Sequence, residues 1–199
     1  MKRILIVLLV VLWPLSLLAD GYGPGDKAMG FKLKNVDGHS ISLDDYTNAK
    51  GFIVIFTCNT CPYAVAYEDR IIDLDNTYRP MGMPVIAVNP NDPSISPGDS
   101  YDKMIERAEE KNFTFPYLFD ETQEVFKAYG ATRTPHVYLL EKDGSDLIVK
   151  YVGTIDDNYK DASQVQKTYL ADAIDAVLQG QDPDPSLTKA IGCTIKYKK

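Results

Sequence analysis

The sequence is poor in the residues that build metal centres and disulfide scaffolds. Its 199 residues include three cysteines, two histidines and one tryptophan. Three cysteines are too few for a disulfide framework. Zinc needs about four ligands, and beyond one closely spaced cysteine pair the chain offers Cys193, His39, His136 and acidic residues. No metal and no organic cofactor is therefore implied, and the chain has no internal repeats or low-complexity segments.

Positive charge is also scarce. The formal net charge is −7, with 28 acidic residues against 21 lysines and arginines. So acidic a chain has no general attraction for nucleic acid or anionic lipid, and we expect neither as a partner. Lys196, Lys198 and Lys199 form a small basic end, which we interpret as solvated rather than as a binding patch.

No uninterrupted apolar run reaches the ~20 residues that a membrane-spanning helix needs. The longest run follows Lys2 and Arg3, and Pro14 interrupts it before the small residue Ala19. This order predicts a signal peptide over residues 1–19, and therefore a periplasmic or secreted protein. A retained N-terminal membrane anchor is the alternative. Without Lys2 and Arg3 the chain has two positive charges fewer, and its net charge is −9.

The remaining length, about 180 residues, suits one domain with a full core. Apolar alternation around Asp37-Gly38 and Asp143-Gly144 predicts two hairpins. Continuous apolar runs and amphipathic patterns predict the other elements. These are strands at 52–57, 84–88 and 115–119, a long loop at 89–99, and helices from 62 to about 79, at 101–111, from 120 to Gly130 and at 163–178.

Strands that alternate with helices indicate an α/β fold. We expect a central mixed sheet with helices on both faces and a β-hairpin at the N-terminal end. The predicted domain covers residues 26–180, and residues 181–199 form a C-terminal tail that contains Cys193.

The most informative stretch is Cys58-Asn59-Thr60-Cys61-Pro62, which directly follows the strand at 52–57. Asn59 or Thr60 can cap a helix, and Pro62 fits the first helical turn, where a missing N–H costs nothing. Cys58 would then face the positive end of the helix dipole, which lowers a thiol pKa from its free value of about 8.5. Two cysteines at this junction are typical of a redox site.

Other interpretations of the cysteine pair are weaker. A c-type haem site needs histidine directly after the second cysteine, where this chain has Pro62. A structural disulfide that closes so short a loop would constrain the unfolded chain little.

Three separated motifs carry a resemblance to a known family. They are CNTCPY at 58–63, FPYLFDETQ at 115–123 and GCTIK at 192–196, and the segment 31–46 adds to them. In this order they resemble the thioredoxin superfamily, and within it the AhpC/TSA and TlpA-like redoxin branch. The likeness covers nearly all of residues 26–199 and implies a thioredoxin-like fold.

The resemblance also implies roles for individual residues. Cys58 would be the attacking thiol and Cys61 the resolving thiol. Pro135 would be cis and pack against the disulfide, and Thr134 beside it would offer a backbone edge to an extended substrate. An ordinary strand-initiating proline is the alternative for this position. Electrons would be exchanged with partner dithiol or disulfide proteins or with small thiols.

The chain also departs from the family pattern. Thioredoxin has a buried carboxylate in the strand before its cysteine pair, and residues 51–57 contain none. Glu68 or Asp69 might substitute, although a solvated helix face is the expected role for both. Arg133 could favour a thiolate at Cys58 if it points inward, and could equally be exposed. Cys193 could be a second resolving thiol, pair between chains, or stay buried and inert.

We therefore predict an exported thiol–disulfide oxidoreductase that uses the Cys58–Cys61 couple. Two other functions stay open. A peroxiredoxin-like thiol peroxidase needs a threonine three residues before its reactive cysteine, where this chain has Cys58 or Ile55, and an arginine from later sequence. A copper carrier of the Sco type needs a longer cysteine spacing and a histidine, for which His136 is the candidate.

Overall fold

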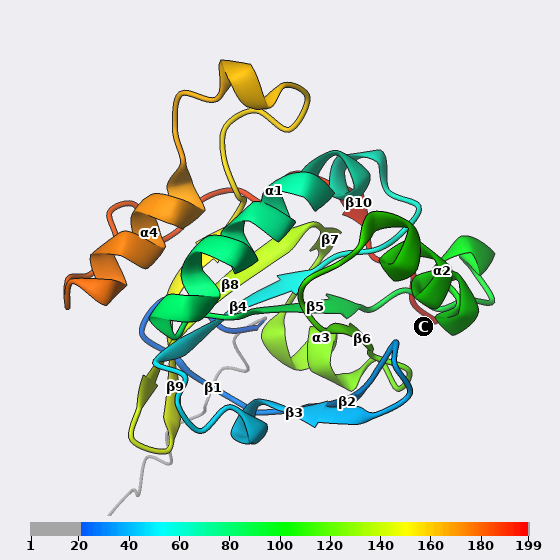
Figure 1. Ribbon diagram of the computed structural model, residues 1–199, viewed down its shortest axis with the longest axis horizontal. Coiled ribbons are helices and arrows are strands. Elements are labelled where there is room, and N and C mark those ends of the chain that lie inside the picture. The colour runs from blue at the N-terminus through cyan, green and yellow to red at the C-terminus, as the bar shows by residue number, and fades with distance from the viewer. Residues whose placement is uncertain (1–20, 199) are drawn as a thin grey trace, which may run out of the picture.

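The computed structural model describes residues 21–198, so the predicted signal peptide at 1–19 lies outside the described residues. An eight-stranded sheet has the order β1-β9-β8-β4-β5-β6-β2-β3 (Figure 1). Its strands are β1 (Lys27–Ala28), β2 (Lys32–Asn35), β3 (Ser40–Ser42), β4 (Gly51–Phe56), β5 (Val85–Asn89), β6 (Tyr117–Phe119), β8 (His136–Asp143) and β9 (Asp146–Gly153). A separate two-stranded ribbon joins β7 (Arg133–Thr134) to β10 (Cys193–Thr194).

Four α-helices accompany the sheet. They are α1 (Pro62–Tyr78), α2 (Tyr101–Lys111), α3 (Glu124–Tyr129) and α4 (Tyr169–Leu178), with short 3-10 turns at Leu43–Asp45, Arg79–Met81, Pro97–Asp99 and Ala162–Gln164. The sheet is mixed, because β4 runs parallel to β5 and antiparallel to β8. This confirms the predicted α/β class with a mixed central sheet.

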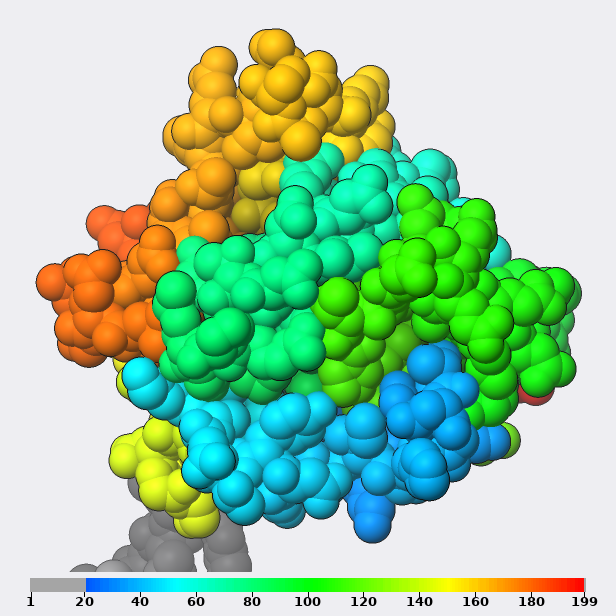
Figure 2. Space-filling view, viewed as in Figure 1, coloured from blue at the N-terminus to red at the C-terminus, as the bar shows by residue number. Residues whose placement is uncertain are grey.

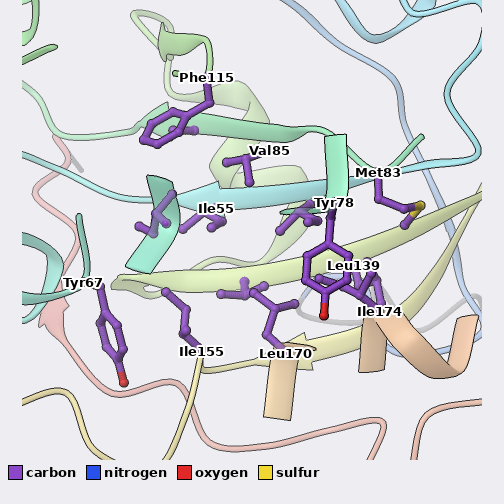
Figure 3. Close-up of a cluster of buried hydrophobic side chains, with 14 of the residues drawn as sticks. Ile55, Tyr67, Tyr78, Met83, Val85, Phe115, Leu139, Ile155, Leu170 and Ile174 are labelled. Atoms are coloured by element: carbon purple, nitrogen blue, oxygen red, sulfur yellow. The ribbon is translucent and has the colours of Figure 1, made fainter. Parts of the chain in front are cut away.

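The sheet is covered on both faces, which explains the continuous apolar runs of its central strands. All six residues of β4 are buried. One face packs against α1, α2 and α4. Figure 3 shows side chains of the strands β4, β5 and β8 converging with those of α1 and α4, among them Ile55, Tyr67, Tyr78, Val85, Leu139, Leu170 and Ile174. The other face packs against α3 through Val125, Phe126 and Tyr129.

The predicted N-terminal hairpin is present as β2 and β3, with Gly38 at a positive φ of 87° in its turn. It joins the sheet through antiparallel pairing of β2 with β6. His39 follows the turn and is exposed, as expected. None of the helices that the structure describes is long and apolar enough to cross a membrane.

The last helix starts later than predicted, at Tyr169 rather than Ser163. Asp161 accepts a hydrogen bond from the Ser163 N–H and starts only a single 3-10 turn. Asp157 then holds the next residues in a loop, because its carboxylate accepts from the Gln166 N–H at 3.0 Å. The loop stands out from the body of the molecule above α1 (Figure 2).

Residues 181–198 contact the domain at several points, although most of their side chains are exposed or half-buried. Leu187 bridges to Val152 of β9, and the Thr188 hydroxyl lies 2.5 Å from that of Tyr151. Further along, Ile195 is buried in the core on the α3 side. Gln123, the N-cap residue of α3, donates its side-chain amide to the backbone carbonyl of Lys196 at 3.0 Å. The tail therefore contributes to the core and to the α3 side of the fold.

Glu68 is not on a solvated helix face, as the sequence had suggested, but only 4% exposed. Both of its carboxylate oxygens accept hydrogen bonds from Arg107 of α2, at 2.7 Å each, and Lys111 lies 3.6 Å away. Asp69, one residue on, is exposed as expected. A bidentate pair of this kind ties α2 to α1 and satisfies the buried charge.

Replacing Arg107 with leucine should lower the free energy of unfolding by about 3 kcal/mol, because it leaves Glu68 buried with only Lys111 near it. Chemical denaturation measures this change. Lys103→Ala on the same helix is the control, because its partner Glu106 forms an exposed pair with it and should add little. Equal effects of the two substitutions would contradict the assigned role of Arg107.

Candidate functional site

The cysteine pair lies between the end of β4 and the start of α1. The strand ends at Phe56, and α1 begins at Pro62 with Cys61 as its N-cap residue. The predicted cap by Asn59 or Thr60 is therefore wrong. Neither side chain caps the helix, because both are held by another loop. Both cysteines are buried, Cys58 with 4% and Cys61 with 2% of its surface exposed.

Thr134 contacts both sulfur atoms. The Cys58 Sγ lies 3.1 Å from the Thr134 hydroxyl, and the Cys61 Sγ lies 3.0 Å from the Thr134 carbonyl oxygen. The Thr134–Pro135 peptide is cis, as the resemblance implied. Thr134 belongs to the short strand β7, so a backbone edge lies directly beside the sulfurs.

The loop between the cysteines is held by Asp99, the last residue of the predicted loop at 89–99. Asp99 is fully buried, and its Oδ1 accepts from the backbone N–H of Asn59 at 2.7 Å and of Thr60 at 3.2 Å. The Asn59 side chain donates to the Gly98 carbonyl and accepts from the Tyr117 hydroxyl. These contacts fix the loop that separates the two cysteines.

The other carboxylate oxygen of Asp99, Oδ2, also accepts hydrogen bonds. It accepts from the Thr60 hydroxyl at 2.8 Å, the Ser96 hydroxyl at 2.6 Å and the Asn91 amide at 2.8 Å. The only signal for this role in the sequence is that Asp99 lies in the long polar loop after β5. Nothing in that loop indicates which distant backbone its carboxylate binds.

The hydrogen bonds at the pair favour a thiolate on Cys61. The neighbouring Cys58 thiol outweighs burial and lowers the pKa of Cys61 to about 4, and the Cys193 N–H, which donates to the Cys61 sulfur at 3.3 Å, acts in the same direction. The same contact with Cys61, together with burial and the nearby Asp99 carboxylate, raises the pKa of Cys58. The Cys61 thiol can donate to the Thr134 carbonyl only while protonated, and the donors outnumber this acceptor.

The sequence-based expectation placed the thiolate at Cys58, and the attacking role of Cys58 stays a prediction. Because Cys61 is the N-cap residue of α1, its sulfur lies at the N-terminal end of that helix. Helix N-termini stabilise negative charge.

The two accessory residues lie on the β7–β10 ribbon. Arg133 is exposed and donates to the Gly192 carbonyl oxygen at 2.9 Å, so its guanidinium binds the tail. Cys193 is half-buried and donates its backbone N–H to the Cys61 sulfur at 3.3 Å. The structure thus brings together Cys58, Cys61, Thr134 and Cys193, with Pro135 and Arg133 next to them.

His136 lies one strand position beyond the cis-proline and is buried. Its Nδ1 accepts from the Thr132 N–H, and burial, followed by the charge of Arg133, lowers the pKa of His136 to about 4. Within residues 21–198, no three His, Cys, Asp or Glu side chains are grouped so that they could hold a metal ion.

Fold and site together define a thioredoxin-fold redoxin. Residues 24–152 match the AhpC/TSA family, more than half of the chain, and the chain belongs to this family. It is similar to a solved structure of an uncharacterized conserved protein from Geobacillus kaustophilus, at 37% identity and a TM-score of 0.80. That match covers 88% of this chain and 92% of the other.

Functionally named relatives are more distant. The thiol-disulfide oxidoreductase ResA of Geobacillus kaustophilus is 29% identical over 123 residues, which is 60% of this chain and 64% of ResA. A Mycobacterium tuberculosis protein with peroxiredoxin in its name is 24% identical over 140 residues, which is 64% of this chain and 84% of that protein. Both names support oxidoreductase activity for the family member described here.

The reduced protein should show a thiolate absorbance that titrates well below the usual thiol range, near the pKa of about 4 given by the contacts of Cys61. Cys61→Ser should remove this low transition. Cys58→Ser should keep it, because a serine hydroxyl can still donate to the Cys61 sulfur. Ultraviolet titration of both variants measures the result. Loss of the transition in Cys58→Ser alone would assign the thiolate to Cys58.

Proposed function

We propose that the protein is an exported thiol–disulfide oxidoreductase whose Cys58–Cys61 pair alternates between dithiol and disulfide. The observation that carries this proposal is the shared contact of both sulfurs with Thr134, at 3.1 Å and 3.0 Å. One residue holds the two thiols together at the start of a helix, where a thiolate is stabilised. The ResA relatives are named for this activity.

The exchange follows ordinary thiol–disulfide chemistry. A thiolate of the pair attacks a substrate disulfide, a mixed disulfide forms, and the second cysteine displaces the reduced product. The pair ends as a disulfide, and a partner dithiol returns the two electrons and two protons. Stabilisation of the Cys61 thiolate favours the dithiol form, which makes the disulfide more oxidising.

A thiol peroxidase is the competing activity, and the family match includes a relative with peroxiredoxin in its name. The binding partners of the arginines count against peroxidase activity. Each of the four between residues 21 and 198 binds elsewhere: Arg70 to Asp156, Arg79 to Asp75, Arg107 to Glu68 and Arg133 to the Gly192 carbonyl. None of these arginines donates to a sulfur of the pair, which counts against a dedicated peroxidase.

With dithiothreitol as electron donor, the protein should accelerate insulin disulfide reduction, and Cys58→Ser and Cys61→Ser should each return the rate to the uncatalysed value. His39→Ala, in the exposed hairpin turn, is the matched control and should keep full activity. Peroxide consumption measured with the same donor should stay slow. Fast peroxide turnover without insulin reduction would replace the proposed activity by peroxidase activity.

Export is proposed from the charged start and apolar run of residues 1–19. When the full chain is expressed with its N-terminus, the mature protein should begin after Ala19 and lie outside the cytoplasm. Cell fractionation and N-terminal sequencing measure both. An unprocessed chain in the membrane fraction would support the retained anchor, and an unprocessed chain in the cytoplasm would refute export.

A further inference from the structure

The backbone edge beside the cis-proline is already occupied by the chain itself. Strand β10 pairs antiparallel with β7, so that Cys193 lies opposite Thr134 and Thr194 opposite Arg133. This is the edge on which an extended substrate would form hydrogen bonds if the proposed function holds. The tail therefore lies where a substrate strand would lie, and it carries a thiol at the matching position.

The tail fits this edge closely. A Cβ atom at Gly192 would come within 2.1 Å of the Thr134 carbonyl oxygen and 3.1 Å of the Pro135 nitrogen. Glycine is thus the residue that permits the approach, for a steric reason. Arg133 binds the Gly192 carbonyl, and the Ile195 N–H donates to the Thr132 carbonyl at 3.2 Å.

The residues that follow secure the docked strand. Ile195 is 3% exposed and packs in the core on the α3 side. The backbone of Lys196 bonds at both ends, its N–H to the Asn91 side chain at 2.8 Å and its carbonyl to the Asp92 N–H at 2.8 Å. Cys193 is therefore held in place beside the cysteine pair.

The three sulfurs differ in access and share one neighbour. Cys58 and Cys61 are 4% and 2% exposed, whereas Cys193 is half-buried. Cys61 is the shared neighbour, since its sulfur accepts from the Cys193 N–H at 3.3 Å and Cys58 packs in the same cluster. With the tail docked, an outside thiol reaches Cys193 more easily than it reaches the buried pair.

We propose that Cys193 is a third redox cysteine, which carries disulfide exchange between the buried Cys58–Cys61 pair and a substrate dithiol outside. The proposal rests on the redox activity of the pair stated above. In this proposal Cys193 takes part in the exchange, and β10 occupies the position that a substrate strand would occupy.

The relay balances in atoms and electrons. Starting from the Cys58–Cys61 disulfide, the Cys193 thiolate attacks the Cys61 sulfur, and Cys58 leaves and takes up a proton. A substrate thiolate then attacks the Cys193 sulfur, and Cys61 leaves as the thiolate that its hydrogen bonds stabilise. The second substrate thiol attacks its own mixed disulfide and releases Cys193. The substrate dithiol has become a disulfide, and its two electrons reside on the sulfurs of Cys58 and Cys61. Cys58 carries one of the two protons, and the other is released to solvent.

The intermediate disulfide can be trapped. Under mild oxidation with diamide, Cys58→Ser should form a Cys61–Cys193 disulfide within one chain, detected by peptide mapping without reduction. The full chain carrying this substitution keeps the contacts of the tail. Free thiols at both positions, or a disulfide only between chains, would overturn the relay.

Kinetics provides the second test. A synthetic peptide with two thiols should be oxidised by the disulfide form of Cys193→Ser at least about tenfold more slowly than by the unsubstituted protein, because attack within the chain is faster than collision. The potential of the Cys58–Cys61 couple against glutathione should stay unchanged, because the substitution keeps the backbone N–H that donates to the Cys61 sulfur. Equal oxidation rates would make Cys193 inert and leave the proposed function intact. An unsubstituted protein that exchanges no disulfides would refute the proposed function and the relay together.

A variant that keeps all three cysteines separates docking from chemistry. Gly192→Ala should slow peptide oxidation as Cys193→Ser does, because the new methyl group collides with Thr134 and displaces β10. Gly30→Ala is the matched control, since a Cβ there meets nothing within 4 Å. If Gly192→Ala oxidised the peptide at the full rate, Cys193 would not need the docked strand, and the proposed relay would be refuted.

Discussion

The contacts of one residue, Thr134, hold this site together. Its hydroxyl and its carbonyl oxygen each lie about 3 Å from one sulfur of the pair, at 3.1 Å and 3.0 Å. Its backbone also forms the edge on which β10 lies. Because the residue is fully enclosed by these neighbours, the cysteines, the cis-proline and the tail keep a fixed arrangement. A change at Thr134 would disturb all three at once.

The surroundings of the two cysteines shift their pKa values in opposite directions. Asp99 keeps its carboxylate in the protein interior by accepting hydrogen bonds at both oxygens, and its charge raises the pKa of Cys58, after the larger effects of Cys61 and burial. Cys61 instead accepts from the Cys193 N–H and lies at the N-terminal end of α1. Similar thiols three residues apart thus acquire opposite tendencies from their surroundings.

The sequence predicted the parts of this arrangement that depend on local patterns. Apolar runs located the central strands, Asp37-Gly38 and Asp143-Gly144 located the hairpin turns, and the spacing of Cys58 and Cys61 identified the redox pair. Contacts between residues far apart in the chain were not predicted from the sequence. Asp99 binds Asn59 across 40 positions and Glu68 meets Arg107 across 39, and neither partner can be read from a local pattern. The N-cap of α1 was placed one or two residues too early, because Cys61 rather than Asn59 or Thr60 is the N-cap residue of that helix.

The distance along the chain between Cys61 and Cys193, 132 positions, has a consequence for biogenesis. A polypeptide emerges from the ribosome in order, so Cys58 and Cys61 are made long before the strand that covers them. During that interval the pair lacks the N–H groups of β10 and is open to solvent and to other thiols. The nascent protein therefore passes through a stage in which its reactive sulfurs are unshielded, and arrival of the GCTIK segment ends that stage.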